Sequence, residues 1–320
     1  MSRSALLAVL LCCTLPGPAH AAAPTGLGSW DRAEQRAVVR AGLMADRDSG
    51  GFGGAERLSG AELTSALAQL GLALGTPAVD AGDDPTVTVA GFDRLLVRQL
   101  GLGDVASAIR AEAGRAGLEP PYRFGSEVVA RYLGLRFDHP FPAGEKLELS
   151  PGEPITRAEA AWSLSRVLRF GGWERDAVRT AFAEFALPDY TPAQLAALRV
   201  AVSKIGMPYI WGGETDGVSY GQDHGGYDCS GFVWRVFKLT NLVTKIDGRT
   251  AEQMSLEIPK RERLSYDELQ PGDLMFFDRP AGHVAIVLGG GWLINSSSQG
   301  VFVQRMDSRG SRFSWGRRVL

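Results

Sequence analysis

Cysteine is scarce in this chain of 320 residues, which holds only Cys12, Cys13 and Cys229. We expect the first two to leave with an N-terminal signal, so the mature protein would keep one cysteine. A single cysteine excludes an intramolecular disulfide and therefore a fold held together by disulfides. An unpaired cysteine in an exported chain is typical of a reactive thiol, although a lone cysteine is more commonly a small buried apolar residue.

Long hydrophobic runs are absent after the first residues. Residues 1–23 have the pattern of a secretory signal peptide: Arg3 is basic, residues 5–15 are apolar, and small residues at 19–23 offer cleavage sites. The apolar stretch is too short to cross a bilayer. The residue before Cys12 is large, which argues against a lipid anchor. We expect a secreted protein without a membrane span, located in the periplasm, at the cell wall or outside the cell.

A strong charge of one sign is also absent. The net charge is −2 and no long basic run occurs, which argues against nucleic acid as a partner. The apolar fraction of 45% and the charged fraction of 22% are ordinary for globular proteins. Length predicts two domains or more. We place them at residues 24–190, a helical repeat region with a junction, and at residues 191–320.

The N-terminal half contains a degenerate helical repeat. At Leu58, Val87 and Ile155 an apolar residue precedes Ser or Thr, which can cap the amphipathic run that follows. In the first and third copies a Glu three residues later completes a capping box. Further helices are expected at residues 33–43 and 127–135. Repeats of this kind bury their apolar faces against one another, which predicts an all-α domain.

The third copy, Ile155-Thr156-Arg157-Ala158-Glu159, resembles the signature of the S-layer homology module. The resemblance implies modules in threes that bind secondary polymers of the bacterial cell wall. The first copy has Ser59-Gly60 in place of Thr-Arg, and the second lacks the Glu. The alternative is that Arg157 and Glu159 only cap and brace their helix.

The C-terminal half changes from helices to strands. Thr191 and Pro192 are suited to open a helix that reaches Ile205, and a second helix begins at Cys229 after a Gly-rich loop. Strands of an antiparallel sheet are expected at residues 274–277, 283–288 and 292–295. Helices followed by such a sheet predict an α+β fold.

Cys229 and His283 are the candidate catalytic pair. A thiol at a helix N-terminus feels the positive end of the helix dipole, which favours the nucleophilic thiolate. A cysteine, a downstream histidine and a polar partner suffice for covalent catalysis on an amide. His224 is a rival base, but it lies in a Gly- and Asp-rich loop. The three side chains lack a repeated ligand spacing, so we expect no metal and no cofactor.

Five motifs in the C-terminal half resemble those of the NlpC family of cell-wall peptidases, which are compact papain-like enzymes. They are Pro208-Tyr209-x-Trp211-Gly212-Gly213, Asp228-Cys229-Ser230-Gly231, Arg249-Thr250-Ala251-x-Gln253, Leu269-Gln270-Pro271-Gly272-Asp273 and Gly282-His283-Val284. The resemblance implies that Cys229 is the nucleophile, His283 the base and Asn295 the third residue, where the family commonly has His. It also implies that Tyr209 lines the site and that Asp228 and Ser230 bind the amine end of the substrate. We expect Trp211 to be a core aromatic.

The position of Asn295 can be predicted from strand geometry. If residues 289–291 form a three-residue turn, Leu288 opposes Trp292 and Ala285 opposes Asn295. Asn295 then lies diagonal to His283 on one face, at ~7–8 Å between backbone positions. A two-residue turn would move Asn295 to the other face.

These features together predict a secreted peptidoglycan endopeptidase that hydrolyses stem-peptide amides by a Cys-His-Asn thiol mechanism. The expected bond joins γ-D-glutamate to a diamino acid. The alternatives are an N-acetylmuramoyl-alanine amidase and a catalytically inactive wall-binding protein. The expected partners are peptidoglycan stem peptides and, through the repeats, cell-wall polymers.

Overall fold

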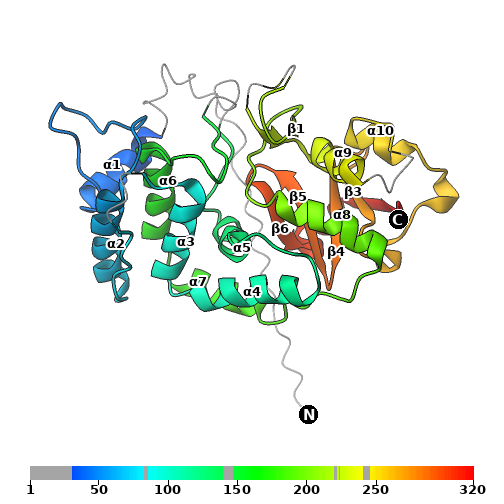
Figure 1. Cartoon of the computed structure of the whole chain (residues 1–320), viewed down its shortest axis with the longest axis horizontal. Coiled ribbons are helices and arrows are strands. Elements are labelled where there is room, and N and C mark those ends of the chain that lie inside the picture. The colour runs from blue at the N-terminus through cyan, green and yellow to red at the C-terminus, as the bar shows by residue number, and fades with distance from the viewer. Residues whose placement is uncertain (1–30, 83–85, 140–146, 220–221, 223, 241–245) are drawn as a thin grey trace, which may run out of the picture.

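The computed structural model describes residues 31–82, 86–139, 147–219, 222, 224–240 and 246–320. The predicted signal peptide, residues 1–23, lies outside them. In the described part of the N-terminal half every regular element is a helix (Figure 1). These helices are α1 (Arg32–Arg40), α2 (Gly60–Leu74), α3 (Val89–Gln99), α4 (Gly103–Arg115), α5 (Phe124–Tyr132), α6 (Arg157–Leu168) and α7 (Trp173–Phe182). Helices α4 and α7 are additions to the predicted set, and α7 occupies the segment predicted as a junction.

The three predicted repeat helices begin alike and meet at one place. The residues before their caps form a closed ring of backbone hydrogen bonds: Leu58 N–H donates to Ile155 O at 3.0 Å, Ile155 N–H to Val87 O at 2.8 Å, and Val87 N–H to Leu58 O at 3.2 Å. The caps are Ser59, Thr88 and Thr156, each accepting from the amide three residues on. The S-layer resemblance remains a prediction.

The capping box is confirmed in α2 and not in α6. In α2 the Glu62 carboxylate bonds back to the Ser59 amide at 3.0 Å. In α6 the Glu159 carboxylate instead contacts Arg136 at 3.2 Å and His139 at 2.6 Å. Glu159 is therefore part of a buried charge network, which the sequence pattern alone does not distinguish from a cap.

The C-terminal half confirms the α+β prediction. Helix α8 (Pro192–Ser203) opens with the predicted Thr191 cap and a capping box. Five antiparallel strands form a sheet in the order β6-β5-β4-β3-β7. They are β3 (Leu274–Phe277), β4 (His283–Gly289), β5 (Trp292–Ser297), β6 (Gly300–Arg305) and β7 (Phe313–Arg317), of which β6 and β7 were not predicted. The other elements are β1 (Glu214–Thr215), β2 (Gly226–Tyr227), α9 (Cys229–Thr240), α10 (Ala251–Leu256) and the 3₁₀ turns η3 (Lys260–Glu262), η4 (Tyr266–Glu268) and η5 (Met306–Arg312).

The sheet buries both faces. Alternate residues such as Phe276, Val284 and Ile294 join the main core, which includes the apolar side of α9. The intervening residues, among them Phe277 and Ala285, form a smaller second core. Alternate residues of each strand thus pack into two different cores, instead of one set facing a core and the other facing solvent. Because α9 packs on β4, its first residue, Cys229, lies beside the strand that begins with His283.

The two halves pack against each other. Phe182 of α7 stacks on Trp292 of β5 with ring centroids 4.8 Å apart. The Arg131 guanidinium donates to Gly206 O at 2.8 Å, and the Asp138 amide donates to Ser298 O at 2.6 Å. Aromatic stacking and buried hydrogen bonds make this an apolar interface with specific polar pairs. The division at residue 190 remains a prediction.

Candidate active site

His283 and Asn295 are directly hydrogen-bonded. His283 Nε2 lies 2.8 Å from Asn295 Oδ1, and both side chains are buried. The Asn295 amide is oriented by its own Nδ2, which donates to Phe302 O on β6 at 3.4 Å. Oδ1 can only accept, so Nε2 carries the proton and Nδ1 is left to accept one. Asn295 thus holds the imidazole in the tautomer that a general base needs.

The hairpin reaches the predicted facing by a different route. Gly289 pairs with Trp292 and Val287 with Leu293, so the turn has two residues and Leu288 forms a bulge. A two-residue turn alone would have moved Asn295 to the far face, but the extra residue restores the register. The predicted three-residue turn is therefore wrong. The predicted placement of Asn295 on the His283 side is confirmed.

Cys229 begins α9 and is 9% exposed. Its pKa is raised, first by burial and then by the charge of Asp228. The backbone N–H groups of Val284 and Ser230 and the Ser230 hydroxyl partly offset this by donating toward the sulfur. The expectation of a lowered thiol pKa is not met, because burial and the charge of Asp228 raise the pKa of Cys229 by more than these hydrogen bonds lower it.

His283 is uncharged at neutral pH. Burial, followed by the positive charge of Arg309, lowers the pKa of His283 to about 3, while the Asn295 hydrogen bond raises it. A neutral imidazole and a protonated thiol are the resting protonation states that these shifts predict. The pair is therefore suited to proton transfer during attack rather than to a standing thiolate–imidazolium pair.

Asp228 is more fully engaged than the sequence indicates. Its carboxylate accepts five hydrogen bonds, from the Gly212 and Gly231 amides, the Ser230 hydroxyl and two nitrogens of Arg249. The Gly231 bond makes Asp228 the N-cap of α9. An ionised carboxylate has about four lone-pair sites, so little acceptor capacity is left. Capping and bracing by Arg249 argue against the predicted use of Asp228 as a free anionic partner for the substrate amine.

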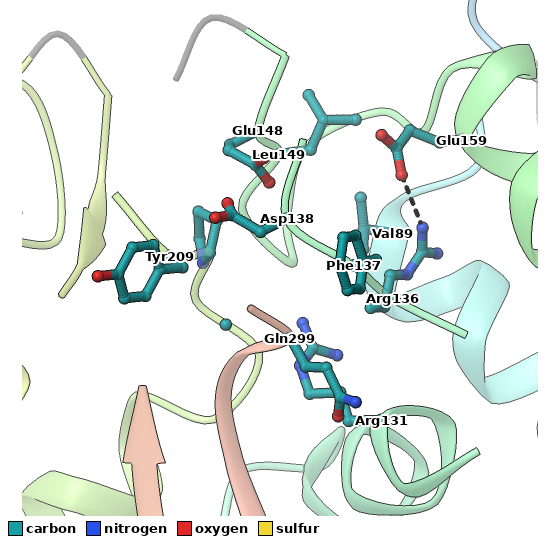
Figure 2. Close-up of a pocket in the computed structure, with 12 residues that line it drawn as sticks. Val89, Arg131, Arg136, Phe137, Asp138, Glu148, Leu149, Glu159, Tyr209 and Gln299 are labelled. Atoms are coloured by element: carbon teal, nitrogen blue, oxygen red, sulfur yellow. Dashed lines mark hydrogen bonds and ion pairs between the residues drawn. The ribbon is translucent and has the colours of Figure 1, made fainter. Parts of the chain in front are cut away.

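Tyr209 lies at the cysteine, as predicted. Burial raises the pKa of Tyr209, and the charges of Cys229, Asp228 and Asp138 raise it further. Asp138 belongs to the N-terminal half, so both halves reach this side of the site. Figure 2 shows the pocket behind Tyr209, with Asp138 and Gln299 on its wall. Its volume of ≈ 30 Å³ admits water rather than a peptide.

The structure decides the sequence predictions for His224, by its contacts, and for Trp211, by its exposure. His224 Nε2 contacts Glu153 at 2.9 Å and Nδ1 contacts Gly225 O at 2.8 Å, so both ring nitrogens are engaged away from Cys229. This disfavours His224 as the base. Trp211 is 76% exposed, so its prediction as a core aromatic is wrong.

Two arginines at the site were missed. Arg249 belongs to a motif that the sequence analysis noted without assigning it a role, and it links Asp228 to Glu214. Arg309 has no signal of its own in the sequence. The positive charge of Arg309 acts on both His283 and Cys229.

Residues 206–317 match the NlpC/P60 family model. They form an NlpC/P60 family domain. The chain is 32% identical over 131 residues to the probable endopeptidase p60 of Listeria grayi, covering 40% of this chain and 22% of the relative. It is 29% identical over 105 residues to the gamma-D-glutamyl-L-lysine dipeptidyl-peptidase of Bacillus subtilis strain 168, covering 31% of each. The chain thus spans under a third of these relatives.

Solved structures with NlpC/P60 domains are also similar. A family protein from Bacillus cereus ATCC 10987 is 27% identical with a TM-score of 0.33, over 43% of each chain. RipD from Mycobacterium tuberculosis is 24% identical with a TM-score of 0.34, over 41% of this chain and 100% of that one. RipD is described as a non-catalytic NlpC/p60 domain protein adapted to a peptidoglycan-binding function.

The described residues contain neither a candidate membrane span nor a candidate metal site. No helix there is long and apolar enough to span a membrane. No group of three or more His, Cys, Asp and Glu side chains in the same residues is arranged to hold a metal ion.

Proposed function

We propose that this protein is an exported thiol peptidase that hydrolyses amide bonds in peptidoglycan stem peptides. The observation that carries the proposal is the Asn295-to-His283 hydrogen bond beside Cys229 at the start of α9. The NlpC/P60 match and the endopeptidase relatives support the substrate class. The oriented pair favours an enzyme over an inactive wall-binding protein, because a binding domain has no need of a fixed tautomer.

The chemistry follows from the geometry. The Cys229 sulfur attacks the amide carbon while its proton moves to His283 Nδ1, and the first turn of α9 offers backbone N–H groups to the developing oxyanion. The imidazolium then gives the proton to the leaving amine as the C–N bond breaks. Water attacks the thioester, again with His283 as base, which releases the acid and restores the thiol. Asn295 accepts from Nε2 throughout.

The proposed bond joins γ-D-glutamate to a diamino acid. Similarity to a gamma-D-glutamyl-L-lysine dipeptidyl-peptidase supports this choice over the bond between glycan and the first alanine. We keep Tyr209 and Ser230 as proposed contacts of the substrate.

Defined muropeptides with mass analysis of the products test the function. The wild type should release the diamino-acid fragment, and Cys229→Ala and His283→Ala should be inactive while folded. Asn295→Ala should lower kcat but leave Cys229 open to labelling by an electrophile, and Asn295→His should be tolerated. Release of the intact stem from the glycan would identify an amidase instead. Activity in Cys229→Ala would refute the thiol mechanism.

The helical half is proposed to attach the protein to cell-wall polymers. Its suitable surface is a groove of ≈ 310 Å³ lined by Arg94, Arg98, Arg110 and Tyr122. None of these arginines forms an ion pair within the described residues, so the groove is open to an anionic polymer. The predicted contact Arg157 is not suited to this, because it is 2% exposed and donates to Ala45 O, Phe52 O and Glu62. Arg157 therefore braces the fold, as the alternative held.

Sedimentation with purified cell walls tests the attachment. The Cys229→Ala protein should cosediment at low salt, and Arg94→Gln with Arg110→Gln should weaken this several-fold. Arg57→Gln removes an exposed arginine of the same half outside the groove and should have little effect. Equal loss in the control would show that binding follows overall charge rather than the groove.

A further inference from the structure

The segment η5 between β6 and β7 carries an arginine that lacks an anionic partner. Its neighbours are paired, Arg305 with Asp307 at 3.3 Å and Arg312 with Asp278 at 2.7 Å. Arg309 has no carboxylate within ion-pair distance among the described residues. Its Nε is buried and has no hydrogen-bond partner there. The charge of Asp278 also acts on Arg309, but the Asp278 carboxylate is already paired with Arg312. A partly buried guanidinium without a direct ion pair is costly, and a ligand carboxylate would lower that cost.

Arg309 lies at the catalytic end of the sheet. Its guanidinium carbon is 5.3 Å from the centre of the Phe277 ring. Phe277 is the cross-strand partner of His283, with ring centroids 5.7 Å apart. The three side chains therefore follow one another from η5 to the base. The electrostatic influence of Arg309 reaches His283 and Cys229 alike, which agrees with this position.

The proposed substrate has the complementary group at this place. A γ-linked glutamyl residue keeps its α-carboxylate beside the scissile amide, and a terminal diamino acid has a carboxylate on the other side. The planar guanidinium binds carboxylates through paired hydrogen bonds, which a lysine or an amide cannot reproduce. The carboxylate of either residue would supply the missing counter-charge.

We propose that Arg309 is a specificity residue that binds a substrate carboxylate next to the scissile bond. The inference rests on the proposed peptidase function and goes beyond it. It makes the enzyme a discriminator between stems with a free carboxylate and stems in which that carboxylate is amidated.

Matched tripeptides test the inference with the full-length protein. The parent is L-Ala–γ-D-Glu–L-Lys, and two variants carry a carboxamide either at the glutamyl α-carbon or at the C-terminus. The wild type should prefer the parent over one of them by about 10- to 100-fold in kcat/KM, the range of a charged hydrogen bond. The arm that shows the preference identifies which carboxylate Arg309 binds.

Arg309→Gln should bring that ratio close to one, chiefly through KM for the parent, and Arg309→Lys should restore part of it. Arg312→Gln is the matched control: it removes a nearby positive charge but should keep the ratio. A change in the His283 pKa would slow all substrates alike, so the ratio isolates carboxylate binding. Circular dichroism and thermal unfolding report whether the variants are folded.

A ratio unchanged by Arg309→Gln, or equal wild-type rates on all three peptides, would overturn the inference and leave the proposed function standing. Failure of the wild type to cleave any of them would overturn both.

Discussion

At the scale of single residues, the site depends on side chains that control one another's protonation. Burial and Arg309 keep His283 neutral, and burial and Asp228 keep Cys229 a thiol. Asn295 contributes orientation without charge, so the imidazolium formed during attack is stabilised less than a carboxylate would stabilise it. At neutral pH the resting site is thus a neutral imidazole and a thiol, with little thiolate.

Asp228→Asn should make Cys229 more acidic. The carboxylate raises the pKa of Cys229, so removing its charge lowers that pKa, while Asn keeps the α9 cap. The pH profile of alkylation by iodoacetamide should rise at lower pH in the variant. In the wild type the midpoint of the rise in alkylation rate with pH should lie above the ordinary thiol pKa of about 8.5.

Asp267→Asn, which removes an exposed carboxylate of η4, is the control and should leave the profile unchanged. A profile that shifts upward in Asp228→Asn would contradict this account of the thiol.

At the scale of elements, the β4–β5 hairpin positions the site. Gly290 has φ 60°, and a Cβ there would lie 2.0 Å from Ala186 O in the N-terminal half. Gly291 has φ 82°, but its nearest neighbour, Arg305, is 3.5 Å away. Both glycines have a left-handed backbone conformation, but only at Gly290 would an added Cβ clash with a neighbouring atom.

Gly290→Ala should therefore destabilise the protein more than Gly291→Ala. Gly291→Ala should lower the free energy of unfolding by about 1–2 kcal/mol through backbone strain alone. Gly290→Ala should lower it further, because the backbone at Ala186 or at the hairpin must also move. Denaturant unfolding measures the difference. Equal losses would show that the hairpin tip is free of the N-terminal half.

Part of this element structure could be predicted from sequence, and the reasons are local. Thr191-Pro192 and Ser59 open helices because their caps are satisfied within four residues. The facing of Asn295 was predictable because the sheet alternates with period two. The Leu288 bulge, the Arg249 bridge and the place of Arg309 were not, because each depends on segments far apart in the chain.

At the scale of the whole molecule, the interface around Trp292 makes the two halves interdependent. Phe182 and Phe185 of the N-terminal half both contact this buried ring of β5. The strand that carries Trp292 also carries Asn295. The helical half, which is the proposed anchor, thus also packs against β5, the strand that carries Asn295.

Phe182→Ala should weaken both halves together. Loss of a buried phenylalanine costs about 3–5 kcal/mol, and the removed ring belongs to one half while its stacking partner belongs to the other. Loss of helical signal and exposure of Cys229 to a thiol reagent should share one midpoint, lowered in the variant. Trp173→Ala, on the exposed side of the same helix, should shift it little. Two separate midpoints in the wild type would show independent domains.

The ring of hydrogen bonds formed by Leu58, Val87 and Ile155 sets an order on folding while the chain is being synthesised. In a chain that is made from its N-terminus, Leu58 and Val87 are available long before Ile155. Until residue 155 is made, the Leu58 amide and the Val87 carbonyl lack their final partners. Unlike an open solenoid, which can grow one unit at a time, this helical half cannot be completed piecemeal. The helical half is completed only when the third copy is available, and the C-terminal half is the next part of the chain to be made.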